Sequence, residues 1–219
     1  LRDNHASYRI PRAAELPDRL GPVLATVMLI FTEGHTATTG DDLTRVDLSA
    51  EAIRLGRVLH DLMPDEPEVT GLLALLLLTD ARRSARLDAA GELVRLADQD
   101  RTRWDRALIS EGHRLVRACL RRGRPGLFQV QAAIAVVHTD AATANATDWS
   151  QIVTLYDQLH ALRPDAVVAL NRAVAVAELR GAAAGLEALD AIDRARLDGY
   201  QPYHAARADL LRRCGRTAE

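Results

Sequence analysis

The densest polar cluster of the sequence lies just before an apolar, helix-like stretch. It comprises Asp98, Gln99, Asp100 and Arg101, with Trp104 three positions further on. Paired carboxylates can do acid–base chemistry when they share a cleft, and Trp and Arg are frequent anchors of protein interfaces. Two interpretations therefore stand side by side. The cluster forms a binding edge, or it caps the start of a helix, with a carboxylate accepting backbone N–H groups and the arginine pairing locally.

A second cluster near the C-terminus combines aromatic and cationic side chains. Tyr203, His204 and Arg207 follow Tyr200 by 3, 4 and 7 residues. These spacings place all four side chains on one face of a helix. Such a face can hold a peptide or can pack on the preceding helix, and the sequence leaves both interpretations open.

The other candidates for chemistry are weaker. The seven histidines form no metalloprotease motif, and neither a phosphate-binding loop nor a nucleophile elbow occurs. Glu33 fits a polar helix end, Cys119 lies among apolar residues as a core position would, and Cys214 is too distant from it to indicate a metal or redox pair. We therefore predict no enzyme activity, no metal and no cofactor. The alternative is a helical enzyme that uses Asp98, Asp100 or Glu33 in a cleft.

Composition excludes several classes of protein. Apolar residues make up 48% of the chain and aromatic residues 4%, with Ala and Leu dominant, which favours a soluble helical protein. The net charge of −2 argues against a chain that binds nucleic acid on its own, because such binding rests on a basic surface. The longest apolar run, residues 72–78, is too short to cross a bilayer. The two cysteines fit a reducing cytoplasm.

Helical periodicity and capping signals predict an all-α protein. Residues 69–78 are apolar on nearly every face, so we expect them to form the most deeply buried helix. Residues 80–100 are instead typical of a helix end, a tight turn and a short extended segment near 92–96. The first expected helix begins at Pro17 and stops at Gly34, the second begins near Thr44 or Asp47 and is ended by Pro64, and the third begins near Glu66 and contains the apolar run. Asp100 or Thr102 can cap the fourth, which runs to about Arg122. Further helices are expected at 126–139, 148–162, 166–180, 182–193 and 199–213.

The last third of the chain repeats with a period of 34. Gly181 and Gly215 follow expected helices at this separation, and the period is typical of tetratricopeptide (TPR) hairpins. Tyr156 and Pro164 match the aromatic and proline positions of a second TPR helix. The predicted fold is an all-α, helical-hairpin array, that is, an α-α superhelix that is TPR-like in its C-terminal third.

Both ends of the chain carry signals of their own. The chain begins with Leu1 instead of Met, so we expect it to be processed or to be part of something longer. Residues 215–219 look like an interrupted repeat, which predicts a longer natural C-terminus or a dimer contact. The expected domains are a linker at 1–16, an N-terminal helical subdomain at 17–123 that includes the extended segment, and TPR-like repeats at 124–219.

Seven segments, in the same order along the chain, resemble one group of proteins. These are the TPR-bearing extracytoplasmic-function (ECF) sigma factors common in actinobacteria, and the resemblance is to their long C-terminal extension. It covers residues 8–219, while the sigma regions that contact the polymerase core and the promoter are missing. The segments are LIFTEGH from Leu29, DLSAEAIRL from Asp47, PDEPEVTGLLALLLL from Pro64, LADQDRTRW from Leu96, GRPGLFQVQAAIA from Gly123, NRAVAVAE from Asn171 and DGYQPYHAARADLLRR from Asp198.

The resemblance implies a cytoplasmic regulatory domain that controls transcription initiation by docking on the sigma regions or on RNA polymerase. The implied partners are the sigma regions of the same polypeptide and the polymerase core, with a small YCII-related protein as a further candidate. DNA would be contacted only through the missing sigma regions, no membrane is involved, and a homodimer stays open. We expect the cluster at 98–104 to be the first contact and the face at 200–207 the second. The alternative is a free-standing TPR adaptor that binds peptides.

Overall fold

The structure is a computed structural model that describes residues 16–36 and 44–216. The chain falls into two compact units, Leu1–Leu55 and Gly56–Glu219. Nearly all of the linker expected at residues 1–16 lies outside the described residues, and so does most of the interrupted repeat expected at 215–219.

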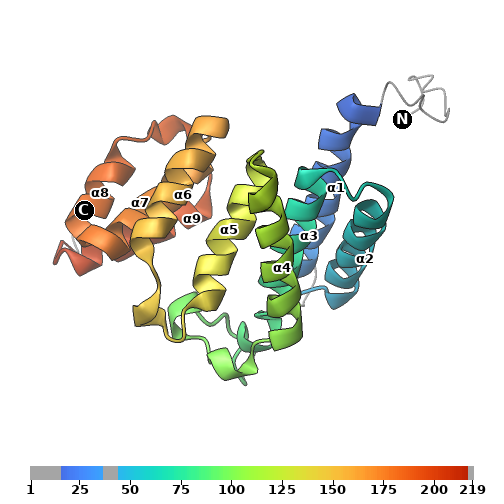
Figure 1. Ribbon diagram of the computed structural model, residues 1–219. Helices are drawn as coiled ribbons and strands as arrows, with labels where there is room; N and C mark the ends of the chain where they lie inside the picture. The colour runs from blue at the N-terminus through green and yellow to red at the C-terminus, as the bar shows by residue number, and fades with distance from the viewer. Residues whose placement is uncertain (1–15, 37–43, 217–219) are drawn as a thin grey trace, which may run out of the picture. The chain divides into compact units, whose positions relative to one another are not determined.

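The described residues form α-helices and no β-strand, which confirms the all-α prediction (Figure 1). Leu87 and Leu93 make an isolated antiparallel bridge within the connection between two helices. Several short 3-10 turns complete the connections. The helices are α1 (Leu16–His35), α2 (Val46–Leu62), α3 (Pro67–Asp80), α4 (Arg106–Arg122), α5 (Leu127–Asp140), α6 (Trp149–Leu162), α7 (Ala166–Arg180), α8 (Ala182–Asp190) and α9 (Gln201–Arg213).

The first unit contains α1 and the beginning of α2. Leu24, Val27 and Phe31 follow one another at helical spacing on α1, and all three are buried. The backbone N–H of Arg45 donates to the carbonyl oxygen of Gly34, 2.8 Å away. This hydrogen bond ties the end of α1 to the start of α2.

Helix α3 forms the core of the second unit, as the apolar run predicts. Every residue from Val69 to Leu78 is buried, because the helix has no polar face to expose. It packs against both α4 and α5. Gly112 of α4 permits the close approach to α3, since a Cβ at this position would lie 2.5 Å from Cγ of Leu78.

Helices α5 to α9 pack in succession, each against the next along the chain (Figure 1). The carboxylate of Asp165 caps α7 by accepting the backbone N–H groups of Val167 and Val168. Gly181 joins α7 directly to α8 with a φ of 93°, a conformation that favours glycine. Helices α5, α7 and α9 begin at residues 127, 166 and 201, so their successive offsets are 39 and 35 residues.

The connection from α3 to α4 folds back onto the ends of both helices. The backbone N–H of Asp105 donates to the carbonyl oxygen of Ala81, 2.8 Å away, and the hydroxyl of Ser84 donates to the carbonyl oxygen of Arg103. Trp104 fills the apolar cluster that these bonds enclose. The connection therefore places residues 95–101 beside the C-terminal helices of the unit, where several of them line a groove.

Candidate binding groove

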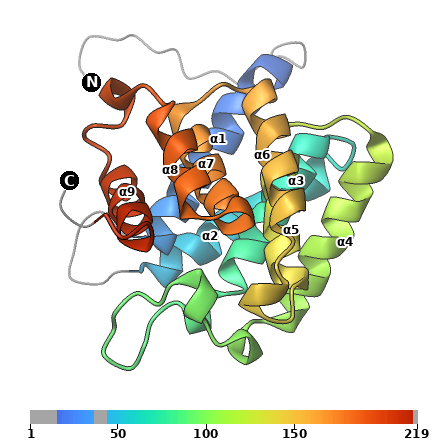
Figure 2. The same cartoon turned by 90° about the vertical axis from the view of Figure 1, so that its left-hand side faces the viewer.

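A groove with a volume of about 720 Å³ runs through the second unit. Its lining residues come from the connection before α4, the end of α5, the loop before α6, and helices α6, α7 and α9. Figure 2 shows the ribbon of these helices. Small-molecule and peptide sites commonly have volumes of this order. Its main polar and aromatic side chains are those of Arg95, Arg101, His138, Asn145, Trp149, Tyr156, Asn171, Glu178, Asp209, Arg212 and Arg213.

Arg101 lines the groove. Its guanidinium donates to the carbonyl oxygens of His138 and Ala141, 2.7 and 2.8 Å away. The same guanidinium stacks on the ring of Trp104, with 4.5 Å between its central carbon and the ring centroid. Carbonyl groups satisfy the hydrogen bonds of this cation without neutralising its charge.

The region around Arg101 carries excess positive charge. Burial and the charges of Arg86 and Arg101 lower the pKa of Arg82 to about 10. Burial together with Arg82 and Arg101 lowers the pKa of His138 to about 4, so this imidazole is neutral at pH 7. The charged neighbours that shift both pKa values are all cations. An anion beside Arg101 would therefore be attracted.

Aromatic and amide side chains also line the groove. The rings of His138 and Trp149 meet edge to face, with centroids 5.4 Å apart. Burial raises the pKa of Tyr156 to about 12, so its phenol keeps its proton. Asn145 and Asn171 are exposed here, and neither side chain has a hydrogen-bond partner within the described part of the chain. Free amides of this kind can bond the backbone of an extended peptide.

The charged side chains that α7 and α9 contribute to the groove are paired with one another. Arg213 of α9 pairs with Glu178 of α7 at 2.6 Å and approaches Asp209 at 3.6 Å. Arg212 pairs with the same aspartate at 2.6 Å. Only the Arg213–Glu178 pair connects α9 to α7, because Asp209 lies on α9 itself, and partial exposure makes each of these pairs weak. The lining of the groove thus combines the positive charge of Arg101 with ion-paired charges on α7 and α9.

The cluster predicted at 98–104 is divided by the structure. Of its members only Arg101 lines the groove. Asp98 pairs with Arg95 at 2.7 Å on the surface, and Asp100 accepts the N–H and hydroxyl of Thr102 as a turn cap. Gln99 donates to the carbonyl oxygen of Val94. Trp104 is only 3% exposed and belongs to the core.

The face predicted at 200–207 packs on the neighbouring helices. Tyr203 is fully buried in the cluster between α7, α8 and α9. Arg207 pairs with Asp190 at the end of α8. His204 bonds the carbonyl oxygen of Asp198, 2.6 Å away. Of the four predicted side chains, Tyr200 and His204 are exposed, and none of the four lines the groove.

Several groove residues were missed although their spacing carried a signal. Asn171 and Glu178 stand seven residues apart on α7, and Trp149 and Tyr156 stand seven apart on α6. Such pairs share a helix face. What the sequence could not show is that these two faces and the end of α9 point to a common space.

The side chains considered for metal, thiol or acid–base chemistry lie at different places in the described part of the chain. They contain no group of three His, Cys, Asp or Glu side chains placed to hold a metal ion. Burial raises the pKa of the Cys119 thiol to about 11, which keeps it protonated. Asp98 and Asp100 are exposed, and Glu33 belongs to the other unit. In the described ranges, no helix is both long and apolar enough to cross a membrane.

Comparison with known proteins gives two matches. Residues 19–120 match a family of unknown function, DUF6596. An uncharacterized protein of Rhizobium meliloti (strain 1021) is 44% identical over 212 residues, which are 97% of this chain and 50% of the relative. The chain therefore spans about half the length of the curated relative that it matches. No solved structure matches the chain.

Proposed function

We propose that the chain is the regulatory domain of an alternative sigma factor of the ECF class, built from TPR-like helical hairpins. Two observations support this proposal. Seven segments resemble the C-terminal extension of such sigma factors, and the curated relative has room for a further domain, because this chain covers only 50% of it. In this proposal the domain works in the cytoplasm and controls transcription initiation through protein contacts.

The groove offers the surface through which such a domain would make its contact. An extended, acidic segment from the sigma regions of the same polypeptide would place a carboxylate at Arg101, where carbonyl groups leave the cation uncompensated. Its backbone would reach the free amides of Asn145 and Asn171, and its apolar side chains would contact Trp149 and Tyr156. The RNA polymerase core and a small YCII-related protein are the further proposed partners. The promoter sequence would be read by the sigma regions.

Multi-round in vitro transcription tests the proposal directly. The sigma regions are compared with and without residues 1–219, on a promoter that they recognise. A regulatory domain changes transcript yield when it is removed. A loss of transcript identifies an intrinsic part of the active holoenzyme, a gain identifies a built-in inhibitor, and an unchanged yield contradicts the proposal.

A variant that fills the groove tests where the contact lies. Asn171→Trp adds bulk at an exposed groove position, so it should block an extended ligand without disturbing the core. Gln151→Trp is the matched control, because Gln151 is exposed on α6 but does not line the groove. We expect Asn171→Trp to change transcription in the same direction as the deletion and Gln151→Trp to behave as the wild type. Equal behaviour of the two variants would place the contact elsewhere.

The same groove also fits a free-standing adaptor that binds an acidic peptide from another protein. The two candidates differ in whether the ligand lies on the same polypeptide. If the adaptor function is correct, residues 1–219 bind an acidic peptide, Asn171→Trp abolishes that binding, and attachment of the sigma regions leaves the affinity unchanged. If the sigma-factor function is correct, the attached sigma regions compete with the peptide and lower its apparent affinity.

A further inference from the structure

Helix α4 carries a row of arginines along its outer face. Arg106, Arg114, Arg117 and Arg121 are all exposed, and at 100° per residue they fall within an arc of about 80°. Ser110 lies in the middle of this arc. From Arg106 to Arg121 the helix rises by about 22 Å. The four cations therefore form a nearly straight line on one side of the second unit, here named the arginine row.

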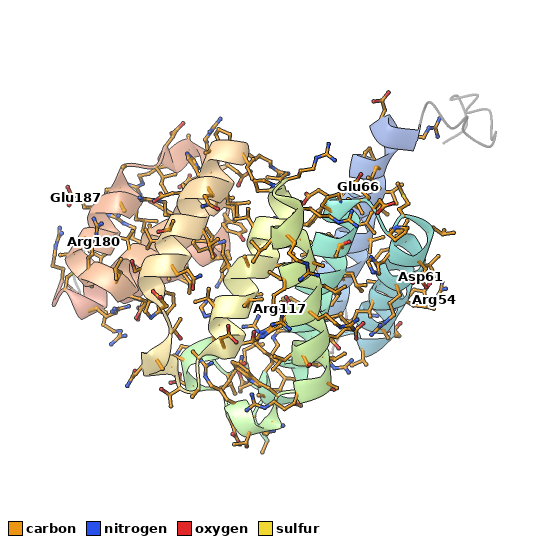
Figure 3. All side chains as sticks on the ribbon, in the orientation of Figure 1. Arg54, Asp61, Glu66, Arg117, Arg180 and Glu187 are labelled. Carbon is orange, nitrogen blue, oxygen red and sulfur yellow. The ribbon has the colours of Figure 1, made fainter. Side chains whose placement is uncertain are left out.

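Packing fixes the direction of the arginine row. Ile109, Leu115, Val116 and Cys119 are buried on the opposite side of α4, which packs against α3 and α5. The helix cannot rotate without exposing these side chains. Its N-terminus is also fixed, because Asp105 caps it by accepting two backbone N–H groups. Figure 3 labels Arg117 on this helix.

The charges of the arginine row are not compensated within the protein. None of its four members forms an ion pair with any residue that the structure describes, whereas many other arginines do. The one carboxylate of α4, Glu111, bonds Arg57 at 2.5 and 2.9 Å on the side of the helix. Arg122, which points away from the row, pairs with Asp65.

We propose that the arginine row binds the phosphodiester backbone of duplex DNA without reading its sequence. Guanidinium groups match phosphate oxygens in a bidentate fork, and a duplex offers a continuous line of negative charge of any length. The row holds no aromatic side chain on which an unpaired base could stack. Contacts of this kind position a protein on a duplex and carry no base specificity.

The composition of the row favours a nucleic acid over an acidic protein. Protein interfaces draw their affinity from aromatic or apolar anchors at the centre of the contact. The residues within the arc are arginines and a serine, and the exposed Leu120 stands beside the arc. The net charge of −2 does not indicate this row, because the 30 acidic residues of the whole chain offset its positive charges in the sum. Local clustering, and not net charge, decides the contact.

The inference does not depend on the groove or on a sigma-factor role, because the arginine row and the groove share no residue. It can therefore be tested on residues 1–219 alone. Fluorescence anisotropy with a labelled duplex of about 25 base pairs should show binding at low salt, with a log–log salt slope of about −3 to −4 for four phosphate contacts.

Paired triple variants make the test specific. Arg114→Gln/Arg117→Gln/Arg121→Gln removes three charges from the row and should reduce the magnitude of the salt slope by about 2.7. Its affinity at low salt should fall at least about tenfold. The control is the triple variant Arg180→Gln/Arg194→Gln/Arg196→Gln, which loses the same charge at exposed positions without ion pairs among the described residues. Circular dichroism confirms that both variants fold.

Three outcomes would overturn the inference. The first is a duplex that fails to bind at low salt. The second is an equal loss of affinity in both triple variants, which would reflect total charge and not the arginine row. The third is polyglutamate that competes as well as DNA of equal charge, which would assign the row to an acidic protein surface. If the arginine row contacts the DNA backbone, the Leu120→Ser variant should bind the duplex with the affinity of the wild type.

Discussion

Arg101 and Trp104 form a stacked pair, with 4.5 Å between the guanidinium carbon and the centre of the indole ring. The same guanidinium donates to two carbonyl groups at the end of α5. The pair thereby connects the segment before α4 to a helix about forty residues away along the chain. The types of these two residues indicate an interface anchor, but the pair is an internal contact. Trp104 is buried, and only Arg101 lines the groove.

Truncation of the indole should cost stability before it affects binding. Trp104 is 3% exposed and packs in the apolar cluster at the end of α3, so Trp104→Ala should lower the free energy of unfolding by about 3–5 kcal/mol. Urea unfolding measures this loss. Leu120→Ala is the control, because Leu120 is 69% exposed and should change stability by about 0.5 kcal/mol or less. A fully stable Trp104→Ala protein would show that the indole acts as a surface anchor.

The stability of the protein should also depend on an arginine, and not a lysine, at position 101. Arg101 bonds two carbonyl oxygens through one nitrogen and stacks through its plane, and an ammonium group lacks that plane. Arg101→Lys should therefore lower the free energy of unfolding by roughly 1–3 kcal/mol. Arg103→Lys, at an exposed position, serves as the control. Equal unfolding midpoints for the two variants would show that Arg101 stabilises the protein only through its charge.

Local patterns predicted the helices well. Asp165 and Gly181 delimit α7 at residues 166–180, as their capping chemistry predicts, and the unbroken apolar run of α3 is buried throughout. The predicted helix at 182–193 ends earlier, at Asp190, because Asp193 caps a separate 3-10 turn at Arg194–Arg196. Such turn chemistry competes with helix continuation over a few residues.

The site could not be predicted in the same way, because its contacts are distant in sequence. The carbonyl partners of Arg101 come from positions 138 and 141, and no spacing rule links them. Tyr203 is buried and Arg207 pairs with Asp190, whereas Tyr200 and His204 are exposed, and only the packing of α9 shows this division. The arginine row of α4 was visible at helical spacing and was obscured by the near-neutral net charge.

The phenol of Tyr203 offers a test between packing and binding. Its hydroxyl is buried and has no hydrogen-bond partner among the described residues. Removal of an unsatisfied buried hydroxyl should leave stability unchanged or raise it by about 1 kcal/mol, so Tyr203→Phe should unfold at an equal or higher temperature. The transcript yield in the multi-round in vitro transcription assay should also be unchanged. A Tyr203→Phe protein that is stable but inactive would restore this residue as a binding contact.

Stability should fall on mild acidification because of His138. The pKa of His138 is about 4 in the folded protein, owing to burial, Arg82 and Arg101, against an ordinary value of 6.5. The unfolded chain therefore binds more protons between these values, and the free energy of unfolding decreases by up to about 3 kcal/mol as the pH drops from 6.5 to 4. Urea unfolding at pH 7 and pH 5 measures the first part of this loss.

Replacement of the imidazole should remove that pH dependence. His138→Gln cannot titrate, so its stability difference between pH 7 and pH 5 should be clearly smaller than that of the wild type. His160→Gln, at an exposed position of α6, should keep the wild-type difference. If the His138→Gln protein loses as much stability as the wild type over this interval, other groups carry the acid sensitivity.

The contact between α3 and α4 should tolerate no added methyl group. A Cβ at Gly112 would lie 2.5 Å from Cγ and 2.7 Å from Cδ2 of Leu78, which is fully buried. Overpacking of this kind costs about 1–3 kcal/mol, which outweighs the gain in helix propensity of up to about 1 kcal/mol. Gly112→Ala should therefore unfold at a lower urea concentration than the wild type. Gly199→Ala, where nothing lies within 4 Å of the new Cβ, should be neutral or slightly stabilising. A stabilised Gly112→Ala protein would mean that α4 can shift along α3, and the direction assigned to the arginine row would then lose its physical basis.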